Sequence, residues 1–186
     1  HEIPETLGAI ELTSIARGYR VVDRMLKQAP VHVLDAGAYC PGKFLIVITG
    51  DVAGVEEALE AGERAAERGF FGKLFIPNLS PPIIPAINRE PTPEPGETIG
   101  VLESFSAVSA IDAADAAVKA AEITVESVNL LHGLGGKAFA VFSGELTDVT
   151  AAVEAGWSRV PEDMIVETQV IPQISRELIP FLPGRS

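Results

Sequence analysis

The sequence repeats itself, and the repeat restricts the chain to a pair of similar domains. Residues 7–11 read LGAIE, and residues 99–103 read IGVLE. Further matches follow in the same order: Asp23 and Lys27 with Asp115 and Lys119, Gly42-Lys43 with Gly136-Lys137, and Ile84-Pro85 with Ile179-Pro180. The offset between matched residues grows only from 92 to 95, so the two halves are collinear. A chain of 186 residues therefore holds two domains of about ninety residues each.

Hydrophobic periodicity gives each half the same order of elements, β-α-β-β-α-β. In the first half we expect strands at 7–12, 31–34, 44–49 and 73–76, with helices at 14–28 and 52–67. In the second half we expect helices at 110–121 and 148–158 and strands at 124–130 and 138–143. This is the split βαβ, or ferredoxin-like, order. It predicts the α+β class, as an α/β sandwich of antiparallel sheets with helices on one side.

Prolines mark the predicted boundary between the two domains. Seven of the fourteen prolines lie from Pro77 to Pro95, and residues 91–96 read PTPEPG. Such a segment is a semi-rigid connector with few hydrogen bonds. We therefore predict a first domain at 1–90, a connector reaching to about 97 and a second domain at 98–186. Residues 180–186 are predicted to form a loosely held tail.

Charge and hydropathy exclude several classes of partner. The net charge of -12 opposes binding to nucleic acid, whose affinity depends on lysine and arginine. The longest strongly apolar stretch, residues 44–48, is too short to cross a membrane, and no leader is recognised. The single cysteine cannot form an internal disulfide, which agrees with a reducing cytoplasm.

Cys40 is the feature that separates the two halves. It lies in a predicted turn, Cys40-Pro41-Gly42-Lys43, and the second half has no cysteine. A chain of two similar domains can fill two places in a ring, so three chains imitate a six-membered ring with three Cys40 residues. Spacing alone gives weak support to a metal-ligand role for Cys40, because no CxxC pair accompanies it, and an inert cysteine in a loop is the alternative.

The sequence contains two patterns that resemble parts of enzyme sites, a P-loop outline and a pair of equivalent glutamates, and neither supports catalysis. Residues 37–43 have the outline of a P-loop, but Phe44 replaces the required Ser or Thr, and a strand follows where a helix must begin. Duplication alone explains the equivalence of Glu11 and Glu103, and Lys43 and Lys137 are interpreted as groups that pack or flank the turns. We predict that the protein is not an enzyme.

The twin openings, the turn at 40–43 and the matched pairs Gly50-Asp51 and Gly144-Glu145 together resemble one family. The chain is similar to tandem-domain bacterial microcompartment (BMC) shell proteins, and in particular to the iron-sulfur tandem shell proteins of propanediol-utilisation compartments. The resemblance extends from Leu7 to about Leu182. It departs at Gln173, where the relatives carry an arginine after Ile-Pro.

The resemblance implies a homotrimeric, pseudohexameric tile in a microcompartment shell of the bacterial cytoplasm, beside other shell proteins. It implies that Cys40 ligates one 4Fe-4S cluster per trimer, for electron transfer across the shell, with an encapsulated redox enzyme as a further partner. The expected pore-lining residues are Tyr39, Cys40, Pro41, Gly42, Gly133, Leu134, Gly135 and Gly136. Lys27 and Lys119 are expected at the tile edge.

Two alternatives remain open. The axis is a metabolite pore without a cluster, in which Gly133, Gly135 and Gly136 allow the second turn to open and close. Otherwise, the chain is a ferredoxin-like trimeric regulator that binds a small ligand between subunits.

Overall fold

A computed structural model describes residues 6–130, 135–183 and 185 of the chain. These residues form two compact units. The first consists of the described residues up to Leu79 together with Gly135 and Gly136, and the second of the other described residues from Ser80 onward. Each unit contains a four-stranded antiparallel sheet.

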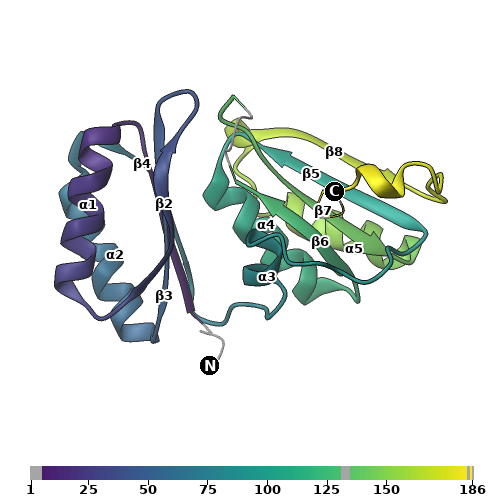
Figure 1. Ribbon diagram of the computed structural model, residues 1–186, viewed down its shortest axis with the longest axis horizontal. Helices are drawn as coiled ribbons and strands as arrows, with labels where there is room; N and C mark the ends of the chain where they lie inside the picture. Colours follow the sequence, from purple (N-terminus) through teal and green to yellow (C-terminus); the bar gives the residue numbers. More distant parts are fainter. Residues whose placement is uncertain (1–5, 131–134, 184, 186) are drawn as a thin grey trace. The chain divides into compact units, whose positions relative to one another are not determined.

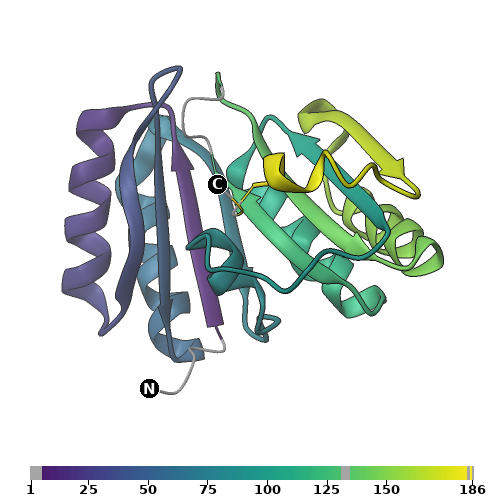
Figure 2. The same cartoon turned by 45° about the vertical axis from the view of Figure 1, so that its right-hand side comes forward.

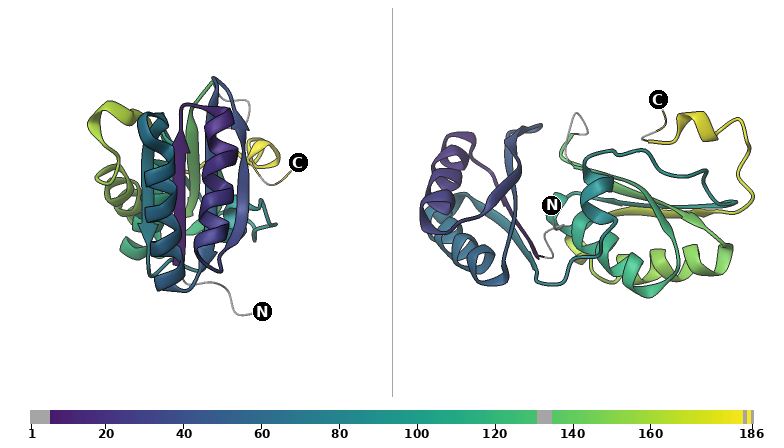
Figure 3. Two further views of the ribbon diagram at one scale, coloured as in Figure 1. Left: turned by 90° about the vertical axis from the view of Figure 1, so that its left-hand side faces the viewer. Right: turned by 60° about the horizontal axis from the view of Figure 1, so that its bottom comes forward.

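The first unit has two helices against one face of its sheet (Figure 1; Figure 3, left). Its strands lie in the order β2-β3-β1-β4. The elements are β1 (Thr6–Leu12), α1 (Ile15–Gln28), β2 (His32–Tyr39), β3 (Lys43–Gly50), α2 (Val52–Ala66), the 3-10 turn η1 (Glu67–Gly69) and β4 (Phe70–Ile76). The predicted order of elements is confirmed in this half.

Local signals place both helices of the first unit. The Ser14 hydroxyl accepts the Arg17 N–H at 3.3 Å, and Asp51 accepts the Gly54 N–H at 2.6 Å, so each helix begins at a capping side chain. Gly18 allows α1 to approach β3, because a Cβ atom there would lie 2.2 Å from the Phe44 ring. The core between the helices and the sheet consists mainly of Ile10, Val21, Met25, Phe44, Ile46, Ile48, Val55 and Leu59.

The second unit repeats this architecture, with strands in the order β6-β7-β5-β8 and α4 and α5 on one face of the sheet (Figure 2). Its elements are α3 (Ile83–Ile87), β5 (Thr98–Ser104), α4 (Ala107–Ala120), β6 (Thr124–Asn129), β7 (Ala138–Gly144), α5 (Leu146–Trp157), η2 (Glu162–Met164), β8 (Ile165–Ile171) and η3 (Ile179–Phe181). The predicted α+β class, with antiparallel sheets and one-sided helices, is confirmed.

Several boundaries differ from the predicted ones, and two of these differences have a clear local cause. Helix α4 begins at Ala107 rather than 110, because the Ser106 hydroxyl accepts the Ser109 N–H and caps the helix as Ser14 does in the first half. Strand β2 continues past Leu34 to Tyr39, with an irregular register between Val33 and Asp35. Its later residues lack an apolar pattern, so pairing with β3 rather than hydrophobicity extends the strand.

Residues 80–90 pack with the second unit, whereas the sequence analysis placed them in the first domain. They include the short helix α3, which packs against β6 and α4. Ile83 and Ile84 are buried there. The proline-rich stretch that follows them placed the predicted boundary after residue 90, but burial of Ile83 and Ile84 holds this helical turn on the second unit.

The predicted loosely held tail is wrong for its described residues. Leu182 is buried against Ile99 and Val141 on the face of the second sheet opposite the helices. Further along, Arg185 lies 3.0 Å from the buried carboxylate of Glu126. Pro183 and Gly184 in the sequence suggested a loose tail, but Leu182 and Arg185 supply specific anchors.

Candidate functional site

The turn that carries Cys40 joins β2 to β3 in the first unit. Tyr39 ends β2, Lys43 begins β3, and the Gly42 N–H donates to the Tyr39 carbonyl at 2.8 Å. Gly42 has a φ of +93°, a conformation that favours glycine. Cys40 is exposed and is preceded in the chain by the buried Tyr39. The hairpin therefore presents its thiol to solvent from a fixed base.

Tyr39 fixes the base of the turn. Its hydroxyl donates to Asp35 at 2.6 Å, and its ring is buried. Burial, then the hydrogen bond to Asp35 and the negative charge of that carboxylate, raise the pKa of Tyr39 well above its usual value. The sequence places Tyr39 at the predicted pore turn but does not reveal Asp35 as its partner. The four-residue spacing is a usable signal, because residues i and i+4 of a strand share a face.

A buried ion pair supports the other side of the turn. The Lys43 Nζ lies 3.6 Å from the Glu11 carboxylate and 3.9 Å from the centroid of the Phe71 ring. The Glu11 side chain is fully buried, and the Lys43 side chain is 14% exposed. The interpretation of Lys43 as a group that packs the turn fits this geometry, but its pairing with Glu11 was not foreseen.

The second unit keeps this pairing at the matched positions. Lys137 Nζ lies 3.0 Å from the Glu103 carboxylate and 5.8 Å from the Phe105 ring centroid. Both groups are partly exposed here. A glutamate on the first strand and a lysine after the turn are thus repeated structural supports, which agrees with the interpretation that duplication accounts for the two glutamates.

The second predicted pore turn is described only from Gly135 onward, and Gly133 and Leu134 lie outside the described residues. Gly135 and Gly136 have φ values of +61° and +86°. A Cβ atom on Gly136 would lie 2.8 Å from Pro41 Cδ, whereas one on Gly135 would meet open space. Within the first unit, Gly136 therefore lies against the turn that carries Cys40.

One chain offers a single cysteine thiol, Cys40, as a metal ligand. Within residues 6–130, 135–183 and 185, three or more His, Cys, Asp or Glu side chains do not gather at any point in an arrangement that could hold a metal ion. The thiol is a suitable ligand for iron because it is exposed and lies on a supported hairpin. The remaining thiolates of a cluster would have to come from other copies of the chain.

The two predicted edge lysines have different surroundings. Lys27 binds Asp23 at 2.7 Å, with both side chains exposed on α1. Lys119 binds Asp115, which is buried on α4 and also accepts the Ser80 backbone N–H at 2.8 Å. The aspartates occupy matched positions in the repeat, but only Asp115 is covered by the segment that leads into α3.

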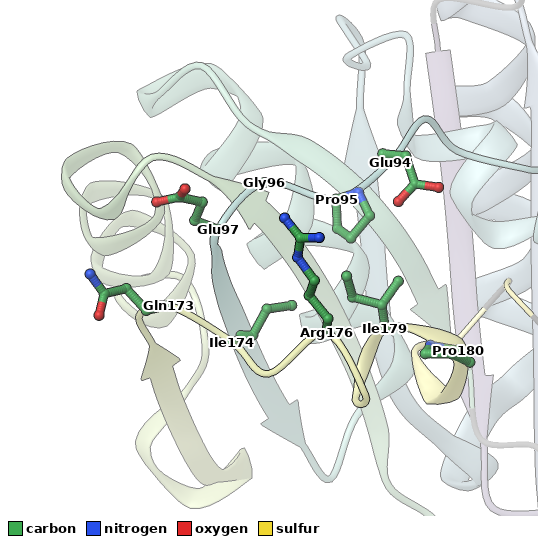
Figure 4. A pocket seen from close by; sticks show the side chains of 9 residues that line it. All are labelled: Glu94, Pro95, Gly96, Glu97, Gln173, Ile174, Arg176, Ile179 and Pro180. Atoms are coloured by element: carbon green, nitrogen blue, oxygen red, sulfur yellow. The ribbon is translucent and has the colours of Figure 1, made fainter.

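A pocket of about 570 Å³ lies in the second unit (Figure 4). Residues 94–97 line one side, and Gln173, Ile174, Arg176, Ile179 and Pro180 line the other. The Ile174 N–H donates to the Glu97 carbonyl at 3.0 Å and closes one end. The segment after β8 therefore lies over residues 94–97 with a pocket between them, so it is only partly packed on its own unit.

The fold and the repeat agree with the comparisons to known proteins. The BMC domain family matches residues 6–79 and again residues 98–174. The chain therefore belongs to the BMC-domain family of bacterial microcompartment shell proteins, as a tandem of two such domains. Within the part of the chain that the structure describes, no helix is long and apolar enough to cross a membrane.

Three relatives are similar to this chain. The bacterial microcompartment shell protein PduT of Citrobacter freundii is 37% identical over 91% of this chain and 92% of its own length. The shell protein EutK of Salmonella typhimurium is 37% identical over 33% of this chain and 38% of its own length. The crystal structure of a microcompartment protein from Desulfitobacterium hafniense DCB has a TM-score of 0.85 and 35% identity, and the match covers 95% of this chain and 98% of that one.

Proposed function

We propose that this shell protein forms a homotrimeric tile whose three-fold axis holds one 4Fe-4S cluster, ligated by one Cys40 from each chain. The observation that carries the proposal is the exposed thiol of Cys40 at the tip of the β2–β3 hairpin. Two domains per chain let three chains fill six places in a ring and supply three thiols. When bound, the cluster would supply one-electron transfer between the two sides of the shell.

The residues around Cys40 are suited to holding a ligand in place. Tyr39 anchors one end of the turn through Asp35, and Lys43 anchors the other through Glu11. Pro41 has no backbone N–H, and its ring restricts the backbone conformation beside the thiol.

The tile would act beside other shell proteins, and its redox partner would be an enzyme inside the compartment. Lys27 and Lys119 would lie at the tile edge, each oriented by an aspartate one helical turn earlier. The proposal includes no catalytic residue, in keeping with relatives that are named as shell proteins.

Anaerobic reconstitution with iron and sulfide tests the cluster. Wild-type protein should become brown and bind about four irons per three chains, and Cys40→Ser should lose both properties. The matched control is Ala38→Ser, an exposed position on the same hairpin that keeps the thiol. Wild-type protein that stays colourless, with no more iron than Cys40→Ser, would overturn the proposal.

A metabolite pore is the second candidate, favoured by the backbone of the second turn. Gly135 has a positive φ and open space around it, so it can change conformation at low steric cost. Substituting Gly135 would then change metabolite passage through reconstituted shells and leave iron content unchanged. The hypothesis of a ligand-binding regulator is set aside because the chain belongs to a family of shell proteins.

A further inference from the structure

Equivalent surfaces of the two units differ in their exposure to solvent. In the second unit, α3 lies beside α4 and over the edge strand β6. The residues of β6 are almost all buried, whereas those of β2, its counterpart, are exposed or half-buried except for Tyr39. Val33 on β2 is 38% exposed and Val125, its matched residue, is 3% exposed.

The same contrast extends to the first helix of each unit. Tyr19 on α1 is 63% exposed, and its match Ile111 on α4 is fully buried. The side chain of Asp23 is 55% exposed, while that of Asp115 is 6% exposed. The surface formed by β2 and the adjacent side of α1, here termed the open groove, therefore lacks the cover that α3 gives to β6 and α4.

A second copy of the α3 segment exists in the chain. Residues 76–85 read IPNLSPPIIP, and residues 171–180 read IPQISRELIP, so Ser80 matches Ser175 and Ala86 matches Phe181. In the first copy the apolar residues are buried, with Ala86 only 2% exposed. In the second copy Phe181 is 82% exposed, and Leu178 is also exposed.

We propose that residues 175–181 of one chain dock in the open groove of a second copy of the same chain, with the Ser175 N–H donating to Asp23. The contact of Ser80 with Asp115 supplies the template, at 2.8 Å. The exposed Phe181 and Leu178 would lie over Val33 and Tyr19. Because the docking surface and the docked segment belong to opposite ends of the chain, the contact runs head to tail.

A head-to-tail contact either closes a ring or propagates without limit. The trimer of the proposed function is a closed ring, so this inference rests on that proposal and specifies the contact that would hold it together. The docked segment can keep its present conformation, because Leu182 and Ile174 hold it on its own unit while Leu178 and Phe181 remain exposed.

Disulfide trapping between copies tests the contact in full-length chains with Cys40→Ser. Asp23→Cys protein mixed with Ser175→Cys protein should give a disulfide-linked pair on a non-reducing gel. The internal control is Ser80→Cys with Asp115→Cys in one chain, which should form a bond within the monomer. The negative control replaces Ser175→Cys with Ser158→Cys, an exposed position at the end of α5.

A second variant tests the apolar part of the contact. Phe181→Glu should weaken self-association about tenfold or more, because a charged side chain would have to be buried at the interface. Leu146→Glu, at an exposed position of α5, should have little effect. Sedimentation velocity over a range of concentrations measures both.

The outcomes separate this inference from the proposed function. Assembled protein whose Asp23→Cys and Ser175→Cys mixture gives no more linked product than the Ser158→Cys control would overturn the contact and leave the tile standing. Protein that stays monomeric at all concentrations would overturn both. Equal self-association of Phe181→Glu and wild type would also contradict the docked position of Phe181.

Discussion

The guanidinium of Arg185 lies 3.0 Å from the carboxylate of Glu126, a side chain with no exposed surface. Glu126 also accepts hydrogen bonds from Thr92 at 2.7 Å and Ser143 at 2.5 Å. The arginine comes from the last residues of the chain and Thr92 from the segment before β5. Glu126 thus connects three separate parts of the second unit to one another.

Replacing Arg185 should therefore be costly. Arg185→Ala leaves the Glu126 carboxylate buried without its cation, and we expect a loss of about 3 kcal/mol in the free energy of unfolding, measured by urea denaturation. Arg159→Ala is the control, because its pair with Asp112 is more exposed and should be worth less than about 1 kcal/mol. Adding Glu126→Gln to Arg185→Ala should recover part of the loss. Equal effects of the two arginine variants would contradict this account.

The two ion pairs beneath the turns should differ in strength. Lys43→Ala removes the cation beside a fully buried Glu11, whereas Lys137→Ala does so beside a partly exposed Glu103. We expect losses of about 3 and about 1 kcal/mol in unfolding free energy. Thermal and urea unfolding of both variants measure the difference. A larger loss from Lys137→Ala would show that the burial of Glu11 does not determine the cost of removing its lysine.

Tyr39 should make stability depend on alkaline pH. Its folded-state pKa is raised above the ordinary value of about 10, so its contribution is complete below that pH and is lost as pH rises beyond it. Tyr39→Phe should be about 1 kcal/mol less stable at neutral pH and should show a smaller decline above pH 10. Tyr19→Phe, at the other, exposed tyrosine, is the control for both measurements. Parallel stability curves for wild type and Tyr39→Phe above pH 10 would refute the assignment.

The contact between Gly136 and Pro41 can be isolated with a matched pair of glycines. Gly135→Ala and Gly136→Ala both place a side chain on a positive φ, but only the second brings a Cβ atom within 2.8 Å of Pro41 Cδ. We expect Gly136→Ala to be less stable than Gly135→Ala by about 1 to 2 kcal/mol. Chemical denaturation of the two variants side by side decides it, and equal losses would remove the steric argument.

The sequence is sufficient to predict the order of elements, because the repeat supplies each signal twice. The first-half helices predicted at 14–28 and 52–67 begin within one residue of those positions in the structure. Helix α3 escaped prediction because its five residues lie among prolines, and only tertiary packing of Ile83 and Ile84 reveals it. Short segments of this kind carry too little periodicity to be recognised in advance.

For the candidate site, the sequence alone was enough to locate the turn but not the side-chain contacts that hold it. Cys40, Pro41 and Gly42 stand together in the chain, so their turn was readable. The pairing of Glu11 with Lys43 joins residues more than thirty positions apart on different strands, and that proximity follows from the register of β1 with β3. The Arg185 anchor was missed for the same reason, since its partner lies on β6.

The accessible Cys40 also makes the natural sequence ready for spectroscopy. A nitroxide attached to this one thiol labels each polypeptide at a single defined point, with no engineered residue. Dipolar spectroscopy on a closed three-membered ring would then give one short interspin distance, and an open filament would give a broad series. The symmetry of the assembly could thus be measured without any amino-acid substitution, before any iron is added.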